Sequence, residues 1–138
     1  TESAVAVSNF TQFYNSAGLC YMGILIGVDR VPVFEWTNAA TGWNLTPRQY
    51  LQIGRRIQTL RQMFNIRHGL DPLKIKVSKR LLGDPPQTVG PNKGVRYQLE
   101  PLMQAYWQEI GWDPDTGIPT PQTLAELEMS DVLVKEVA

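Results

Sequence analysis

Apolar residues recur every three or four positions over much of the chain, and this spacing predicts helices rather than strands. The longest such stripe comprises Tyr50, Ile53, Ile57, Leu60 and Phe64. Thr46 can cap this helix and Pro47 suits its first turn. Gly69 follows the basic residues that suit its other end. We therefore expect a helix of about 22 residues from position 47, roughly 33 Å long, with the stripe facing the core.

The same periodicity predicts a helix from about residue 100 to residue 110, which Gly111 ends. Another starts at residues 120–121 and carries Leu124 and Leu127. Weaker helical segments are expected at residues 4–14, 19–26 and 33–40. Residues 74–78 alternate as a strand would, but the run is short and ambiguous. The pattern predicts an all-α, multihelical fold.

Several residues that could carry chemistry have a simpler structural interpretation. The four tryptophans lie on or beside helical stripes, and we expect them in the core: Trp36, Trp43, Trp107 and Trp112. His68 suits the end of the long helix as a cation or a packed ring. The basic pairs at 55–56 and 79–80 are expected to be solvated faces. We predict no catalytic residue among them.

Proline and glycine dominate residues 83–94 and exclude a helix there, so we expect an extended surface connection. The spacing of a phosphate-binding loop is absent from it. Residues 113–117 start with Asp-Pro and predict a turn rather than a calcium loop. With 138 residues, the chain is expected to be a single helical domain over 1–138 with this connection inside it.

The composition is that of an ordinary soluble protein, with 43% hydrophobic residues, 19% charged residues and a formal net charge of zero. Thirteen basic residues balance thirteen acidic ones, so no net basic charge favours nucleic acid. The longest apolar run, residues 22–28, is too short to span a bilayer and lacks the features of a signal peptide. We expect a cytoplasmic protein with no nucleic-acid or membrane partner.

The chain has one cysteine, Cys20, which can neither close an internal disulfide nor complete a metal site by itself. It is either a small buried hydrophobe or one ligand of a cofactor whose other ligands lie elsewhere. A single histidine likewise excludes a histidine-based metal site within the chain. The first residue is Thr1 rather than Met, which is compatible with a piece of a longer protein.

Six short segments follow one another along the chain. Residues 15–21 read Asn-Ser-Ala-Gly-Leu-Cys-Tyr, and the others lie at 36–43, 54–57, 64–69, 90–94 and 111–120. Together they resemble the motifs of the aldehyde ferredoxin oxidoreductase family, the tungsten-pterin enzymes, beginning with its D-x-x-G-L-C-x motif. Each motif alone is weak, whereas six in order over about residues 15–127 make a strong resemblance to the C-terminal part of that family.

The resemblance implies that the intact protein oxidises an aldehyde to a carboxylic acid and passes electrons to ferredoxin. Its cofactors would be a tungsten (or molybdenum) bis-pterin and a 4Fe–4S cluster. This chain would be a helical domain that closes one side of the cofactor site, and its partners would include the missing N-terminal domains and a small-molecule substrate. The resemblance leaves room for a homo-oligomer. The isolated chain is expected to hold no cofactor and to be inactive.

The resemblance also implies roles for four residues. Cys20 would be the fourth thiolate of the cluster, whose other three cysteines lie upstream. Asn15, Leu19 and Tyr21 would line a pterin. The family has an aspartate where this chain has Asn15, and an amide keeps one acceptor but adds donors and loses the charge.

Two alternatives remain open at this point. One is a cofactor-free helical interaction or scaffold domain derived from the family. The other is a family member that acts on a non-aldehyde substrate, such as an aromatic thioester. Residues 70–80 depart from the family's pattern, which leaves the substrate undecided.

Overall fold

The computed structural model describes residues 1–20, 22–23 and 31–131. Within these ranges the elements are α1 (Glu2–Ser16), α3 (Val33–Thr41), α4 (Pro47–Arg67), the 3₁₀ helix η2 (Pro72–Lys74), α5 (Leu99–Ile110) and α6 (Pro121–Glu126). The described residues form isolated bridges but no strand. No helix in this part of the chain is long and apolar enough to cross a membrane. The prediction of an all-α fold is confirmed.

The longest helix, α4, begins as its sequence predicts. The Thr46 hydroxyl accepts from the backbone N–H of Gln49 at 3.4 Å, and the Gln49 side chain accepts from the Thr46 N–H at 2.9 Å. These two bonds satisfy N–H groups that the first turn of a helix leaves without partners, and Pro47 has no N–H to satisfy. The start of α4 is therefore determined locally.

Four helices end in the same turn, in which a left-handed residue is followed by an apolar one. The left-handed residues are Gly18, Gly69, Gly111 and Glu128. The apolar residues are Leu19, Leu70, Trp112 and Met129, and each donates its N–H to the carbonyl five positions earlier at 2.7–3.4 Å. This pattern is the Schellman motif, which satisfies carbonyls at the helix end.

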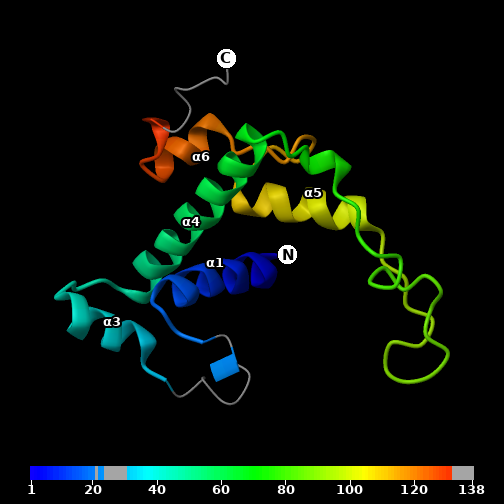
Figure 1. The fold of residues 1–138 in the computed structure, drawn as a ribbon, viewed down its shortest axis with the longest axis horizontal. Helices are drawn as coiled ribbons and strands as arrows, with labels where there is room; N and C mark the ends of the chain where they lie inside the picture. The colour runs from blue at the N-terminus through cyan, green and yellow to red at the C-terminus, as the bar shows by residue number, and fades with distance from the viewer. Residues whose placement is uncertain (21, 24–30, 132–138) are drawn as a thin grey trace.

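Helix α1 crosses α4 and also packs against α5 (Figure 1). The crossing with α4 surrounds an aromatic cluster made of Phe13, Tyr14, Val33 and Tyr50, with Phe34 stacked on Tyr50 at 5.3 Å between ring centroids. A second cluster comprises Val5, Trp107, Ile110 and Trp112. A third holds Leu124, Leu127 and Met129. The core therefore consists of several small clusters distributed over α1, α4, α5 and α6 rather than one large one.

The predicted core stripe of α4 is only partly buried. Tyr50 is buried, but Leu60 and Phe64 are exposed, and the other buried residues of α4 are Gly54 and Thr59. Gly54 faces the backbone of α1, and the Thr59 hydroxyl accepts from the indole N–H of Trp112 at 3.4 Å. Burial along α4 thus follows the segments that cross it rather than the apolar stripe, and the prediction is wrong for Leu60 and Phe64.

Residues 75–98 form a protruding arm between η2 and α5, drawn in green to yellow-green in Figure 1. The prediction that residues 83–94 are non-helical is confirmed, but the connection folds back on itself rather than running extended. The Tyr97 N–H donates to the Leu82 carbonyl, and the Gly94 N–H donates to the Gln87 carbonyl, both at 2.9 Å. Residues 75–78 form no strand, because no neighbouring strand pairs with them.

Of the predicted helix at residues 19–26, positions 21 and 24–26 lie outside the described residues, and residues 22–23 are helical as predicted. Its first two residues, Leu19 and Cys20, are not helical and belong to the turn that follows α1. The predicted helix therefore starts too early, because Gly18 has a positive φ that ends α1, and Leu19 and Cys20 belong to the resulting turn. The predicted helices at residues 4–14 and 33–40 are confirmed by α1 and α3.

Candidate functional site

The segment at residues 15–20 forms the C-terminal turn of α1. Gly18 has a φ of 79°, a conformation that glycine adopts without the steric cost other residues meet. The Gly18 N–H donates to the Asn15 carbonyl at 3.2 Å, and the Leu19 N–H donates to the Tyr14 carbonyl at 3.4 Å. Leu19 packs against the aromatic cluster. The Gly-Leu step therefore stops the helix and anchors the chain that follows it.

This turn brings three of the four predicted site residues together. Asn15 and Cys20 are exposed, and Leu19 is half-buried. Tyr21, the fourth, lies outside the described residues. Cys20 is a free thiol, and no group of three or more His, Cys, Asp or Glu side chains in the described part of the chain could hold a metal ion. An exposed thiol fits a role as one ligand of a set that is completed from elsewhere, since an iron–sulfur cluster takes four ligands.

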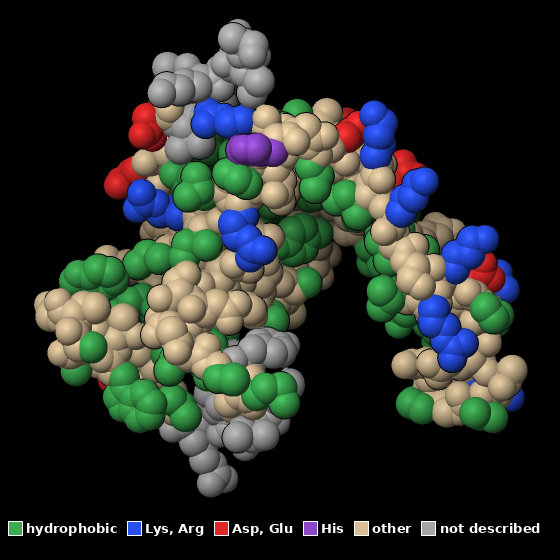
Figure 2. Space-filling view, in the orientation of Figure 1, with side chains coloured by type: hydrophobic (Ala, Val, Ile, Leu, Met, Phe, Trp, Pro, Cys, Tyr) green, Lys and Arg blue, Asp and Glu red, His purple; other side chains and the backbone are tan. Residues whose placement is uncertain are grey.

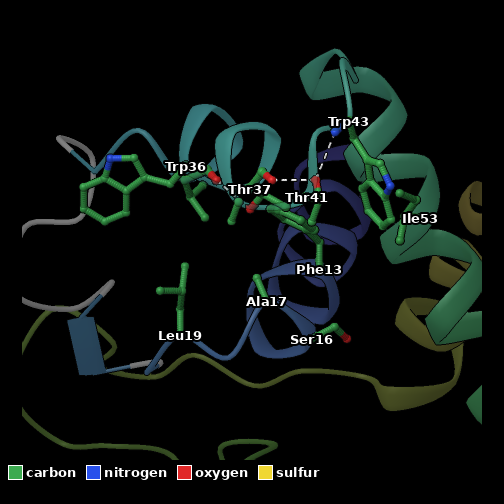
Figure 3. Close-up of a pocket in the computed structure, with 11 residues that line it drawn as sticks. Phe13, Ser16, Ala17, Leu19, Trp36, Thr37, Thr41, Trp43 and Ile53 are labelled. Carbon is green, nitrogen blue, oxygen red and sulfur yellow. Dashed lines mark hydrogen bonds between the residues drawn. The ribbon is translucent and has the colours of Figure 1, made fainter.

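A pocket of about 460 Å³ opens beside this turn, between α1, α3 and α4 (Figure 3). Its lining is mostly apolar and comprises Phe13, Ser16, Ala17, Leu19, Val33, Trp36, Thr37, Ala40, Thr41, Trp43 and Ile53. Trp36 and Trp43 border it with 55% and 53% of their surface exposed, so the prediction that they belong to the core is wrong. Trp107 and Trp112 are buried as predicted. The spacing of apolar residues along the sequence could not distinguish a buried tryptophan from one that borders an open pocket.

The segment at residues 36–43 shapes the wall of this pocket. The Asn38 side chain donates to the Leu45 carbonyl at 2.9 Å and accepts from the Leu45 N–H at 3.0 Å. The same amide oxygen accepts from the Tyr50 hydroxyl at 2.6 Å. The Thr41 hydroxyl accepts from the Trp43 N–H at 3.2 Å (Figure 3). These bonds fix the loop that carries Trp43, which is a structural task for Asn38 and Thr41.

The segments at 54–57 and 111–120 meet at the end of α5, although more than fifty residues separate them. The Arg55 guanidinium donates through Nε to the Ile110 carbonyl at 3.0 Å and pairs with Glu126 at 3.6 Å. The Gly111 carbonyl accepts from the hydroxyls of Thr120, at 3.1 Å, and Thr123. Arg55 was expected on a solvated face, and that prediction is wrong because the guanidinium satisfies a helix-end carbonyl.

Residues 113–117 form a turn next to this joint, as predicted. The Asp113 carboxylate accepts from the Thr116 hydroxyl and the Thr116 N–H, both at 2.8 Å, and from the Asp115 N–H at 3.1 Å. The hydrogen bond from the Thr116 hydroxyl lowers the pKa of Asp113 most, and the two backbone N–H groups add to it. The Gln62 amide donates to the Gly117 carbonyl at 2.8 Å. This part of the molecule is a structural joint between α4, α5 and α6.

His68 caps α4 and stacks on Phe64 with 4.0 Å between ring centroids. Its Nδ1 lies 2.8 Å from the Phe64 carbonyl, and since a carbonyl only accepts, Nδ1 carries the proton. The interpretation of His68 as a packed ring at a helix end is confirmed. Of the six segments singled out in the sequence, the one at residues 90–94 lies in the protruding arm, residues 75–98.

A family model described as aldehyde ferredoxin oxidoreductase, domains 2 & 3, matches residues 1–129. The tungsten-containing aldehyde ferredoxin oxidoreductase of Pyrococcus abyssi (strain GE5 / Orsay) is 33% identical over 129 residues, which cover 94% of this chain and 21% of that protein. The enzyme of the same name from Pyrococcus furiosus is 32% identical over 127 residues, covering 92% and 21%. The chain therefore spans about a fifth of the length of these curated relatives.

A further relative has a different name. The aliphatic sulfonate oxidoreductase, WOR-like subunit, of Pyrococcus furiosus is 32% identical over 127 residues, covering 86% of this chain and 20% of that protein. The match has nearly the same identity as the matches to the aldehyde enzymes. Similarity over this part of the chain consequently does not separate the two substrate classes.

Proposed function

Because the chain belongs to the aldehyde ferredoxin oxidoreductase family, we propose that it is the C-terminal, cofactor-enclosing part of an enzyme that oxidises aldehydes to carboxylic acids. Ferredoxin is the electron acceptor, and the enzyme works in the cytoplasm. The observation that carries the proposal is the turn at the end of α1, which exposes the chain's one thiol beside Leu19 and Asn15. The overall reaction takes one aldehyde and one water to a carboxylic acid, two protons and two electrons, and the electrons leave singly to two ferredoxins.

Cys20 is the residue of this chain that binds a 4Fe–4S cluster, through its thiolate to one iron. The other three thiolates come from the part of the protein outside these 138 residues. Leu19 and Tyr21 line the pterin, and the Asn15 amide oxygen accepts from a pterin N–H group. When bound, the tungsten or molybdenum pterin supplies the two-electron chemistry and the cluster supplies the one-electron path. The residues of this chain bind and orient these groups and help to exclude water.

The fit of Cys20 to this role rests on the shape of its turn. Gly18 lets the backbone reverse at the end of α1, and Leu19 is held in the aromatic cluster. The backbone that leads into the thiol from α1 is thereby fixed before any cofactor binds, which lowers the conformational entropy that is lost on binding. A cysteine buried as a small hydrophobe would lie in one of the clusters, whereas Cys20 is exposed.

A second candidate function is oxidation of a substrate that is not an aldehyde. The observation that favours it is the similarity to the relative named for aliphatic sulfonates, which is 32% identical to this chain, the same identity as that of the Pyrococcus furiosus aldehyde enzyme. A cofactor-free scaffold role is the remaining alternative. It predicts that replacing Cys20 leaves the spectrum of the whole protein unchanged.

Cys20→Ser in the full-length protein tests the proposal. Serine is nearly isosteric, but its hydroxyl is a poor ligand for iron compared with a soft thiolate. We expect a lower iron content and an altered electron paramagnetic resonance spectrum of the reduced protein, with unchanged helicity by circular dichroism. Ser16→Ala, in the same turn, is the matched control and should leave both unchanged. An unaltered spectrum in Cys20→Ser would reject the ligand role.

The substrate class needs a separate assay. Wild-type enzyme is offered short aldehydes and short aliphatic sulfonates, and reduction of ferredoxin is followed in each case. Reduction with aldehydes supports the proposed reaction. Reduction with sulfonates alone would support the second candidate, and the cofactor role of Cys20 would stand in either case.

A further inference from the structure

The arm, residues 75–98, stands away from the body of the described protein (Figure 2). Its two limbs hold each other through the Tyr97–Leu82 and Gly94–Gln87 backbone hydrogen bonds. The limbs also touch at Gly83, where a Cβ would overlap the Val95 carbonyl oxygen. The arm therefore has a defined shape of its own.

Apolar side chains on the arm are left uncovered. Leu81 and Val89 have 71% and 76% of their surface exposed, and Tyr97 is exposed as well. At the base of the arm, a pocket of about 420 Å³ is lined by Leu73, Ile75, Leu99, Glu100, Met103, Gln104, Trp107 and Asp115. Large apolar side chains this exposed on one segment, together with an apolar pocket at its base, indicate an interface in a soluble protein.

The arm is also strongly basic. Five basic residues lie on it, against one acidic residue, Asp84: Lys76, Lys79, Arg80, Lys93 and Arg96. Arg96 pairs with Asp84 at 3.8 Å. The other four are exposed, and none of them has an acidic partner among the described residues. Figure 2 shows these basic side chains distributed along the arm. The arm therefore carries both exposed apolar side chains and exposed basic side chains.

We propose that the arm is an interdomain strap that packs on the part of this protein's own chain outside these 138 residues. The surface that it covers carries both apolar and acidic side chains, to match the exposed leucine, valine and basic residues. The proposal uses the arm and the family membership alone, so it holds or fails independently of the role of Cys20.

The length of the relatives is the first reason to choose this occupant. The chain spans 21% of their length, and the arm lies within the matched residues 1–129, so most of a family protein is available to cover it. The apolar surface is the second reason. Transient electron-transfer contacts are small, whereas permanent interfaces are larger and more hydrophobic. An acidic carrier protein would account for the basic residues but not for exposed Leu81 and Val89.

Limited digestion of the native full-length protein with trypsin tests the proposal, because trypsin cleaves after Lys and Arg. We expect slow cleavage after Lys79, Arg80 and Lys93, at a rate that does not depend on protein concentration. The variant Leu81→Asp with Val89→Asp should raise the cleavage rate at these sites about tenfold, since proteolysis follows the population of the open form. Gln87→Asp, which adds a charge at an exposed polar position of the arm, is the matched control and should stay near the wild-type rate.

Three results would overturn the proposal. Rapid cleavage of the wild-type arm would mean that it is free. Protection that grows with protein concentration would mean that a second copy covers it, for which the acidic residues 99–131 offer a complementary surface. Protection that appears only when an acidic ferredoxin is added would assign the arm to the carrier.

Crosslinking provides a measurement that needs no variant. A carbodiimide joins lysines directly to neighbouring carboxylates, so it reports which acidic residues lie beside the arm. We expect Lys79 or Lys93 to link to Asp or Glu outside these 138 residues. Links that reach only residues 99–131 of another copy would contradict the strap.

Discussion

Gly54 on α4 lies directly against the backbone of Asn9 on α1, and a Cβ at position 54 would overlap the Asn9 carbonyl oxygen. Both residues are buried, and α1 packs against α4 here more extensively than against α5. The missing side chain therefore sets how closely the two longest helices approach. Because the aromatic cluster and the turn that carries Cys20 belong to the same end of α1, the position of the candidate site depends on this contact.

Gly54→Ala should destabilise the fold by about 1–3 kcal/mol, the usual cost of overpacking. In an exposed helix the same change would stabilise by roughly 0.5–1 kcal/mol, so the sign of the effect reports the close contact. Urea denaturation followed by circular dichroism measures it. Gln52→Ala, at an exposed position of α4, should change stability little. A more stable Gly54→Ala would mean that the helices do not touch at this point.

Asn38→Ala should lower the free energy of unfolding by about 1–3 kcal/mol, because it leaves the buried Tyr50 hydroxyl and the Leu45 backbone without partners. Tyr50→Phe removes one of those bonds and should cost less, about 0.5–1.5 kcal/mol. The double variant should lose less than the sum of the two, since the bonds share one amide oxygen. Strictly additive losses in this mutant cycle would contradict the network.

Arg55→Lys should destabilise the joint between α4 and α5 by about 1–2 kcal/mol, because a lysine ammonium cannot reproduce the Nε–H bond to the Ile110 carbonyl. Thermal unfolding of the two variants Arg55→Lys and Arg56→Lys measures the difference. Arg56 is exposed, and its change should stay within about 0.5 kcal/mol. Equal effects at both positions would place Arg55 on the solvated face that the sequence predicted.

Acid should weaken the turn at residues 113–117. The hydrogen bonds from Thr116 and Asp115 lower the pKa of Asp113 in the folded state, so the carboxylate stabilises the fold at pH values above its unfolded pKa. That contribution is lost as the pH falls from about 4, the ordinary range of Asp, through the folded pKa. Asp113→Asn should show a flatter decline of stability over this range than the wild type. Parallel curves for the two proteins would contradict the assignment.

Asn15→Asp tests the proposed pterin contact in the full-length protein. A carboxylate only accepts hydrogen bonds and so suits pterin N–H groups better than an amide, with a gain on the order of 1 kcal/mol. We expect higher metal and pterin content after gel filtration. Ser16→Asp adds the same charge next to it and should bring no gain. Lower occupancy in Asn15→Asp would mean that the local site has adapted to an amide.

Local signals in the sequence predicted the helices well because local interactions build them. The capping box of Thr46 and Gln49 and the glycine stops at 69 and 111 each involve residues within a few positions of one another. Six short segments in order were also enough to indicate the family before any contact was known. The turn that carries Cys20 could also have been predicted, since a Gly-Leu step after a helix is the signature of a Schellman motif.

Which face of each helix is buried could not be derived in the same way. Leu60 and Phe64 continue the apolar stripe of α4 and are exposed, whereas Gly54, Thr59 and Arg55 make the contacts that join α4 to α1 and α5. Arg55 donates to a carbonyl 55 positions away, and no spacing of residues along the chain predicts such a partner.

The sequence by itself thus determined most of the helices, the clearest of their ends and the family, because those depend on neighbours along the chain. Only the tertiary structure decided that Trp36 and Trp43 border an open pocket, that Arg55 caps α5 and that the arm stands uncovered. The physical reason is that burial depends on which helices cross and how closely. Those crossings result from contacts between residues far apart in the sequence, which side-chain periodicity does not encode.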